Sequence, residues 1–256
     1  MSQDLSRELA AAKKAALLAG KVQLEFLASS SKRIEIKSDA SPVTEVDVRC
    51  EALIREILEK EFPDDGFLGE ESGESRSKSG RTWIVDPIDG TRPYIRGIPT
   101  FSALIALEEK GEAIVGVMYL PGLNECYTAY KGGGAFLNDK PIRVSQTEKL
   151  TDAMGSGLGF IQRPGSELAV RQLKLFSESN YFYGFMDAFT YGLIASGRMD
   201  YSVNLLDKPW DLAAAACIVK EAGGRFSTLA GENNVLKGSS VLTNGLLHEA
   251  VLGYFR

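Results

Sequence analysis

The chain has 256 residues, 44% of them hydrophobic, which is enough for a sizeable core in one large domain or in two closely packed halves. The formal net charge of −5 argues against a general nucleic-acid-binding protein, which usually shows a basic balance or a basic stripe. No segment approaches the roughly 20 apolar residues that span a membrane, and the first residues lack the apolar stretch of a secretory signal, so we expect neither a membrane nor a nucleic-acid partner.

The first part of the chain predicts two helices with a short extended piece between them. Apolar residues recur at helical spacing in Leu5–Ala16, which indicates a first helix. The alternating stretch Ile34–Lys37 follows. Thr44 is placed as the N-cap of a second helix, with Asp47 three residues later, and the buried face of this helix ends near Phe62.

Residues 82–145 are dominated by β-rich runs that are separated by turn signals. Lys110-Gly111 and Pro121-Gly122 are two of these turns. An antiparallel meander fits the pattern. The runs are Thr82–Val85, Thr100–Leu107, Ala113–Leu120 and Glu125–Ala129.

After about residue 146 the pattern changes to alternating strands and helices. No Pro/Ser-rich linker separates the two parts, so we expect one compact unit with an α+β subdomain over 1–145 and an α/β subdomain over 146–256. The expected elements are a strand at Met199–Val203 and helices at Leu168–Phe176, at Ala188–Ala195, from Pro209 to Gly223-Gly224, and at Leu246–Phe255.

The histidine and cysteine counts exclude further chemistries. His248 is the single histidine and lies in a plain helical stretch, which disfavours Ser-His-Asp, Cys-His and His-rich zinc sites and predicts a surface or packing role. Cys50, Cys126 and Cys217 lie far apart and are odd in number, which favours buried free thiols in a reducing cytoplasm. Acid–base chemistry is therefore expected from carboxylates, hydroxyls or metal-bound water.

Two aspartates three residues apart directly follow an apolar strand. Pro87 stiffens this turn and Gly90 permits an unusual backbone angle, so the side chains of Asp86 and Asp89 can converge beyond the strand end. Ligands that are all oxygen favour a hard cation such as magnesium. Thr91 begins what is predicted as a short helix, whose first N–H groups could hold a phosphate. An ordinary capped turn would also explain this motif taken alone.

Three further acidic residues each have an ordinary structural interpretation as well. Glu70 follows an apolar pair and a glycine and would suit the solvated end of a loop. Asp211 lies in the first turn of a predicted helix, where the helix dipole favours negative charge. Asp47 could be the reciprocal capping partner of Thr44. Taken together, these acidic sites favour a metal centre over several unrelated structural roles.

Three motifs resemble the inositol monophosphatase family. Trp83–Arg96 is similar to the first signature of that family, Trp210–Gly224 is similar to the second, and Gly69–Ser72 matches its acidic loop. The motifs occur in the order and at the spacing of the family, and the resemblance covers nearly the whole chain. It implies a five-layered αβαβα sandwich of the sugar-phosphatase type, with an α+β half followed by an α/β half, and a homodimer.

The resemblance also implies a magnesium-dependent phosphomonoesterase that hydrolyses a small phosphorylated metabolite with metal-activated water. Two to three Mg²⁺ ions are expected in each active site, with Mn²⁺ as a substitute and Li⁺ as an inhibitor. Glu70, Asp86 and the Ile88 carbonyl would hold the first ion. Asp86, Asp89 and Asp211 would hold the second, and a third would lie near Glu70. Two metals bridged by a carboxylate suit phosphoryl transfer, which needs charge neutralisation and in-line positioning.

Roles for the residues around the metals follow from the same resemblance. Thr91 would pair with Asp47 to orient and deprotonate the attacking water, with Glu70 close by. The Gly90 and Thr91 amides would bind the phosphate, and Asp89 is also expected to contact the substrate.

The substrate-reading positions depart from those of strict inositol phosphatases. Asn204 replaces the acidic residue that binds sugar hydroxyls there, and Phe185-Met186-Asp187 replaces a Gly-Thr-Ala segment. Asp187, Gly97–Pro99 and Lys208-Pro209 are similar to the histidinol-phosphate phosphatase branch, although that branch tends to keep the acidic residue. A carboxylate at position 187 could pair with a substrate amine. Inositol monophosphate is the expected substrate and histidinol phosphate the alternative.

Two further functions, a nucleotidase and a regulatory binding protein, are less favoured. A 3′(2′),5′-bisphosphate nucleotidase is disfavoured because the chain has no aromatic or basic insertion to hold a nucleotide. A regulatory binding protein that kept the fold is disfavoured because such a relic would have lost a metal ligand.

Lys37 and Asp39 match the mobile loop that closes over the metals in the family.

Overall fold

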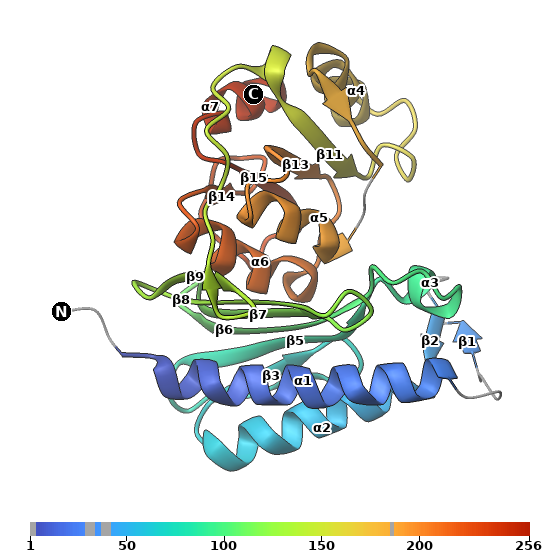
Figure 1. Ribbon diagram of the computed structural model, residues 1–256, viewed down its shortest axis with the longest axis vertical. Helices are drawn as coiled ribbons and strands as arrows, with labels where there is room; N and C mark the ends of the chain where they lie inside the picture. Colours follow the sequence, from blue (N-terminus) through green and yellow to red (C-terminus); the bar gives the residue numbers. More distant parts are fainter. Residues whose placement is uncertain (1–3, 29–33, 37–41, 185–186) are drawn as a thin grey trace.

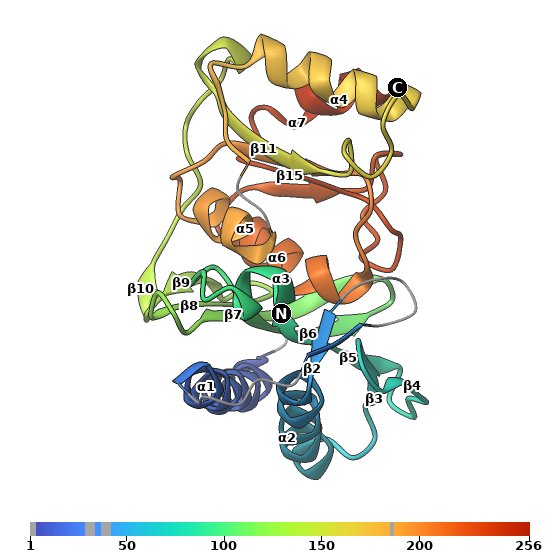
Figure 2. The same ribbon diagram turned by 90° about the vertical axis from the view of Figure 1, so that its right-hand side faces the viewer.

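The computed structural model describes residues 4–28, 34–36, 42–184 and 187–256. Helices α1 (Ser6–Ala28) and α2 (Glu45–Glu61) form an outer layer against one face of an eight-stranded sheet (Figures 1 and 2). The inner stripe of α1 is built largely from alanines that are fully buried. Small side chains at these positions let the helix lie close to the sheet.

The remaining helices form two further layers. Helices α5 (Asp187–Ala195) and α6 (Pro209–Glu221) lie between the large sheet and a second sheet of five strands. Helices α4 (Glu167–Glu178) and α7 (His248–Leu252) pack on the outer face of the second sheet. The five-layered αβαβα sandwich is therefore confirmed.

The large sheet is an antiparallel meander from β5 to β10, extended at one edge by β3 and β4. Its order is β10-β9-β8-β7-β6-β5-β3-β4, and β3 and β5 pair in parallel. The strands are β3 (Gly66–Gly69), β4 (Gly73–Ser75), β5 (Arg81–Asp89), β6 (Ser102–Glu109), β7 (Glu112–Leu120), β8 (Glu125–Tyr130), β9 (Gly134–Leu137) and β10 (Lys140–Pro141). A separate antiparallel pair joins β1 (Ile34–Ile36) to β2 (Pro42–Thr44).

The second sheet is mixed and has the order β12-β11-β13-β15-β14. Strand β11 pairs in parallel with both β12 and β13, whereas β15 pairs antiparallel with both β13 and β14. Its strands are β11 (Met154–Leu158), β12 (Tyr181–Phe182), β13 (Tyr201–Asn204), β14 (Arg225–Ser227) and β15 (Ser240–Thr243).

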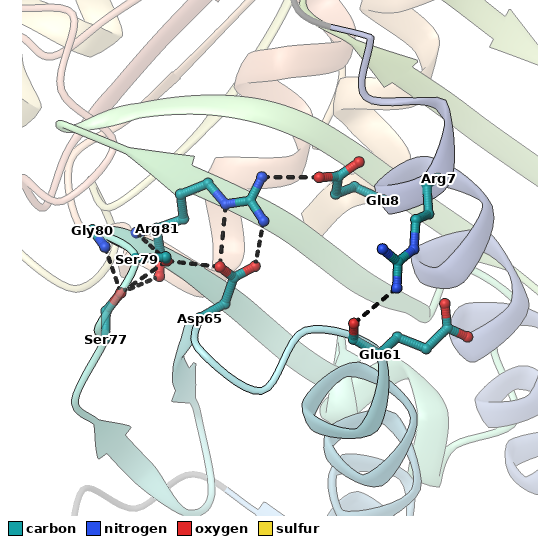
Figure 3. Close-up of polar contacts among 8 residues, drawn as sticks. All are labelled: Arg7, Glu8, Glu61, Asp65, Ser77, Ser79, Gly80 and Arg81. Carbon is teal, nitrogen blue, oxygen red and sulfur yellow. Dashed lines mark hydrogen bonds and ion pairs between the residues drawn. The ribbon is translucent and has the colours of Figure 1, made fainter.

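An arginine at the start of β5 ties this strand to the helical layer (Figure 3). Arg81 donates to both carboxylate oxygens of Asp65, at 3.1 and 3.0 Å, and to Glu8 of α1 at 2.9 Å. The Ser79 hydroxyl also donates to Asp65, at 2.7 Å. One guanidinium therefore fixes three segments around the beginning of the strand that leads to the candidate site.

Most predicted elements agree with the structure, and the C-terminal one is a correction. The sequence predicts a helix over Leu246–Phe255, whereas α7 spans His248–Leu252 and continues as a 3₁₀ turn at Gly253–Phe255. Gly245 adopts φ 86, which interrupts helical backbone just before this segment. Pro209 begins α6 as predicted. The division at residues 145 and 146 stays a prediction, because α6 belongs to the second part and packs against the large sheet.

Two further expectations can be compared with the structure. All three cysteines are buried and free, as predicted. Among the described helices, none is long and apolar enough to cross a membrane.

Candidate active site

Strand β5 carries two of the predicted metal ligands to one end of the large sheet. In a regular strand, residues three apart point to opposite faces. Here the pairing with β6 shifts, because Asp86 is opposite Leu104 and Asp89 is opposite Ser102, so β5 has one residue more than β6 between these pairs. This irregularity lets both aspartates line one pocket. Pro87 is tolerated in this irregular stretch, because a bulged residue needs no hydrogen bond to the neighbouring strand.

Asp89 also joins two elements that meet at the pocket. Its Oδ2 accepts from the Ser102 hydroxyl of β6 at 3.1 Å and from the Ala188 amide at the start of α5 at 2.8 Å. An acceptor at the first turn satisfies a helix N–H group that has no partner within the helix. The same carboxylate that faces the pocket therefore positions α5 against the sheet.

The turn after β5 leads into the short helix α3 (Thr91–Ile95). Gly90 has φ 76, in the left-handed region that glycine adopts readily. A Cβ at this position would lie 3.2 Å from Asp187 Oδ2, so the glycine also leaves space for that carboxylate. The Thr91 hydroxyl donates to the Ile88 carbonyl at 3.0 Å and closes the turn.

Two more carboxylates reach the pocket from other elements. Glu70 follows β3, and its amide donates to the Val85 carbonyl at 3.2 Å, which anchors it beside β5. Asp211 lies in the first turn of α6, where its Oδ2 accepts from the Lys208 amide at 2.7 Å. Asp211 therefore lies in the first turn of a helix as predicted, it also caps that helix, and it lines the pocket.

The pocket brings together residues that are far apart in the sequence. Its wall combines acidic side chains with the first turn of α3 and a few apolar residues. The lining residues are Glu70, Asp86, Ile88, Asp89, Gly90, Thr91, Arg92, Pro93, Leu158, Asp187, Tyr191, Leu206, Asp207 and Asp211.

Burial and mutual repulsion raise the pKa of the carboxyl groups in this pocket. Burial is the largest cause of the raised pKa of Asp86, and neighbouring carboxylates add to it. The pKa of Asp89 is raised by burial and then by the charge of Asp187. The pKa of Asp211 is raised by burial and then by the charge of Asp207. A bound cation would favour the ionised form of each group.

Asp187 and Asp207 bring two further carboxylates into the pocket. Burial raises the pKa of each to about 6, and the charge of Asp207 adds to the effect on Asp187, while Arg92 opposes it. Asp187 has φ 61, which is uncommon outside glycine, and its buried Oδ2 has no hydrogen-bond partner among the described residues. Asp207 Oδ2 accepts from the Ser240 hydroxyl and, at 3.3 Å, from the Tyr191 hydroxyl.

Asn204 lies behind the pocket wall. It is 3% exposed and is not among the lining residues. Its Oδ1 accepts from the Leu158 amide at 2.8 Å, and its Nδ2 donates to the Tyr191 hydroxyl. Asn204 therefore holds two residues that do line the pocket, and its direct contact with a substrate stays a prediction.

Three other predicted residues are not placed in the pocket. Asp47 lies buried in the first turn of α2, 1% exposed, and is not among the residues that line the pocket. The pairing of Asp47 with Thr91 stays a prediction. Lys37 and Asp39 lie outside the described residues, so the expected mobile loop is untested.

The oxygen donors of the pocket fit a hard divalent cation. Glu70, Asp86, Asp89 and Asp211 share the lining with Ile88, and each aspartate has its pKa raised with help from other carboxylates. Within the described ranges, no three His, Cys, Asp or Glu side chains are already drawn close enough to hold an ion. The two findings are compatible, because a bound cation would draw carboxylates that repel each other closer together. The ligand assignment stays a prediction.

Sequence reasoning missed several pocket residues. Asp207 follows the buried strand β13, and the position of a polar residue just beyond a strand end was a signal that could have found it. Arg92 lies inside the first motif but had no role assigned to it. Tyr191 and Leu206 carry no local signal, because only the packing of α5 and the loop after β13 brings them to the pocket.

Comparisons with known proteins agree with this fold. The model of the inositol monophosphatase family matches residues 4–256. A histidinol-phosphatase from Chlorobaculum parvum is 38% identical over 248 residues, which are 95% of this chain and 92% of the relative. An inositol-1-monophosphatase from Mesorhizobium japonicum is 35% identical, over 93% of this chain and 92% of the relative. The solved structure of an inositol monophosphatase from Zymomonas mobilis has a TM-score of 0.88 at 29% identity, with 99% of each chain covered.

Proposed function

Because the chain belongs to the inositol monophosphatase family and is a phosphoric monoester hydrolase, we propose that it acts with divalent metal ions, with magnesium preferred. The observation that carries this proposal is the group of carboxylates in one pocket whose pKa values burial and mutual repulsion raise. Such a group needs cations to be stable in its ionised form.

The ligands follow the assignment made from the sequence. Glu70, Asp86 and the Ile88 carbonyl hold a first ion, Asp86, Asp89 and Asp211 hold a second, and a third binds more weakly near Glu70. Bound divalent ions supply positive charge to the phosphate oxygens and acidify the attacking water. Mn²⁺ substitutes for Mg²⁺, and Li⁺ inhibits.

The protein's own groups orient the phosphate and the water. The Gly90 and Thr91 amides lie at the left-handed turn that begins α3 and face the phosphate. The Thr91 hydroxyl accepts the proton of the attacking water as it passes its own proton to the Asp47 carboxylate, with Glu70 close by. This hydroxyl donates to the Ile88 carbonyl at 3.0 Å, so the proton transfer requires it to change its hydrogen-bond partner.

The metal assignment is tested by Asp89→Asn. Asparagine keeps an oxygen that can accept from Ser102 and Ala188, so the fold is retained while a charged ligand is lost. We expect kcat to fall by about 10²-fold to 10³-fold, of the order seen when a group that stabilises the transition-state charge is removed, with little change in circular dichroism. Asp64→Asn, on the surface, is the matched control. Near-normal phosphatase rates in Asp89→Asn would show that the ligand assignment is wrong.

Asp187 and Asp207 support a substrate that carries a positive charge. The pocket is lined by six carboxylates and one guanidinium, that of Arg92, so even three divalent ions leave a negative balance once a doubly charged phosphate has entered. A substrate amine beside Asp187 and Asp207 would offset this charge. We therefore favour histidinol phosphate, in agreement with the name of the Chlorobaculum relative. Inositol monophosphate, the substrate expected from the sequence, is the second candidate, and the name of the Mesorhizobium relative supports it.

The two candidates are separated by a substrate panel with purified protein and Mg²⁺. Histidinol phosphate, inositol 1-phosphate and a bisphosphorylated nucleotide are compared in the wild type and in Asp207→Asn. If the carboxylate binds the amine, the variant raises KM for histidinol phosphate by about tenfold or more and changes KM for inositol 1-phosphate by less than about threefold. Equal effects on both esters would exclude a role in recognising the amine.

The remaining expectations belong to the same proposal. The enzyme forms a homodimer. It works in a reducing compartment, the cytoplasm, which the three buried free thiols favour. Analytical ultracentrifugation tests the oligomeric state. Nucleotide hydrolysis and a purely regulatory role are the disfavoured functions.

A further inference from the structure

A buried glutamate of α2 accepts hydrogen bonds from the backbone of the loop that carries Glu70. Glu51 is 2% exposed, and its two carboxylate oxygens accept from two consecutive amides of the loop. Oε2 accepts from the Glu71 amide at 2.8 Å, and Oε1 accepts from the Ser72 amide at 2.7 Å. Hydrogen bonds from N–H groups to a carboxylate are among the stronger ones in proteins.

The loop backbone around Glu70 is therefore fixed on both sides. The Glu70 amide donates to the Val85 carbonyl of β5 at 3.2 Å, and the next two amides donate to Glu51. One turn further along α2, Arg55 donates to the Ser72 hydroxyl at 3.2 Å. Helix α2 and strand β5 together leave the backbone at Glu70 little freedom.

The glycine before Glu70 is required by the same contact. A Cβ at Gly69 would lie 2.5 Å from both Cδ and Oε2 of Glu51, closer than real Cβ contacts occur. The carboxylate of Glu51 thus lies flat against the backbone of Gly69. The need for glycine at the first position of the Gly69–Ser72 motif comes from a side chain 18 positions earlier in the chain. The motif itself does not reveal this contact.

Glu51 does not line the pocket, so it has no direct contact to offer a substrate. A buried carboxylate is costly unless its charge is satisfied, and an apolar residue would fill the same space without that cost. The geometry points to Glu51 as a positioning residue that holds Glu70 in the place from which it binds a metal ion. This inference rests on the proposed role of Glu70 as a metal ligand.

The test compares metal affinity with loop order in the purified, metal-free full chain. Glu51→Gln keeps the shape but turns one acceptor into an N–H donor that faces a backbone amide. Glu51→Asp keeps the charge but shortens the reach. Glu56→Gln, exposed on the same helix, is the control. Isothermal titration with Mg²⁺, and with Mn²⁺ as a second probe, gives the dissociation constants. Amide hydrogen exchange at Glu71 and Ser72 reports whether the loop is held.

If Glu51 positions Glu70, both Glu51 variants raise the Mg²⁺ dissociation constant by about 10-fold to 100-fold, the usual effect of losing a partner that orients a metal ligand. Exchange at Glu71 and Ser72 accelerates, and Glu56→Gln behaves as the wild type. Gly69→Ala reaches the same result from the opposite side of the contact, and it serves if a Glu51 variant does not fold.

A cycle with Glu70→Gln distinguishes positioning from general stability. In the Glu70→Gln background, adding Glu51→Gln changes the dissociation constant by less than about twofold, because the ligand that Glu51 orients is already lost. An unchanged affinity in Glu51→Gln, with faster loop exchange, would limit Glu51 to a structural role and overturn the inference. An unchanged affinity in Glu70→Gln itself would overturn the metal assignment as well, so the two failures are distinguishable.

Discussion

At the scale of single residues, the one histidine shows how a potentially reactive group is made inert. His248 is fully buried between Ser227 and Thr243, at 2.9 Å from Nε2 and 3.1 Å from Nδ1. The Ser227 hydroxyl donates to the Thr228 carbonyl, so it accepts from Nε2–H, and Nδ1 accepts from Thr243. Burial lowers the pKa of His248 to about 4. The packing role predicted from the sequence is therefore correct, and the ring is neutral at neutral pH.

This burial makes the stability of the protein depend on His248 in mild acid. A depressed histidine pKa gives stability that is fully present above the unfolded value near 6.5 and is lost as the pH falls towards 4. Between pH 7 and pH 5 the loss is about 2 kcal/mol. We expect His248→Gln to have a correspondingly flatter dependence of the unfolding free energy on pH, measured by urea denaturation.

The comparison between variants isolates this group from the pocket carboxylates, whose raised pKa values act in the opposite direction. Leu246→Gln, at an exposed position two residues away, is the control and should follow the wild type. Parallel curves for wild type and His248→Gln would contradict the assignment of a depressed pKa.

At the scale of elements, the strand that carries the site is anchored at its beginning and distorted at its end. Arg81, the first residue of β5, forms ion pairs with Asp65 and with Glu8 of α1 (Figure 3). Towards the far end of β5, the irregular pairing with β6 directs the side chains of both Asp86 and Asp89 to one pocket. The anchor is remote from the pocket, so it affects stability more than chemistry.

Breaking this anchor should destabilise the protein without altering the reaction. Arg81→Met leaves Asp65, whose side chain is 2% exposed, buried without its cation. We expect a loss of about 3 kcal/mol in the free energy of unfolding, as for other buried pairs from which one partner is removed. Denaturant titration measures the loss, and KM at saturating Mg²⁺ should stay unchanged.

The chain offers a matched control on its surface. Lys78 and Asp64 are 3.9 Å apart with side chains 81% and 71% exposed, so Lys78→Met should cost less than about 0.5 kcal/mol. A similar loss in both variants would contradict the view that burial makes the Arg81 contact important.

At the scale of the whole molecule, the pocket concentrates negative charge where the two sheets and the middle helices meet. Groups with a raised pKa stabilise the fold below their unfolded pKa, and this contribution is lost as the pH rises through the folded value, about 6 for Asp187 and Asp207. The metal-free protein is therefore stabilised by protonation of the pocket in acid. Divalent ions that bind the same carboxylates would replace protons as the stabilising cations.

Magnesium should accordingly raise the melting temperature, and more at high pH than at low pH. A ligand at 100 times its dissociation constant stabilises by about 2.7 kcal/mol, which for a chain of this size corresponds to about 5–10 °C. Scanning fluorimetry at pH 8 and pH 5, with Mg²⁺ or with a chelator, measures the difference. A shift that is equal at both pH values would show that the ions do not bind these carboxylates.

The sequence predicted much of the fold because its signals are local. The meander, the second helix and the start of α6 at Pro209 follow from alternation, capping and turn residues within a few positions. Four of the short strands of the second sheet were not found, since runs of two to five residues carry little periodic signal. The final helix was predicted too long because Gly253–Phe255 forms a 3₁₀ turn and Leu246 lies in the turn before the helix, and composition alone does not distinguish such turns from an α-helix.

By itself, the sequence determined the acidic motifs, their order and hence the family, because those motifs lie within short stretches of chain. Only the tertiary structure decided which side chains meet. The irregular pairing of β5 put Asp86 and Asp89 on one side, the placement of α5 and the loop after β13 added Tyr191 and Asp207, and α2 supplied Glu51. These contacts join residues distant in the chain, and they depend on strand register and helix packing, which no local pattern encodes.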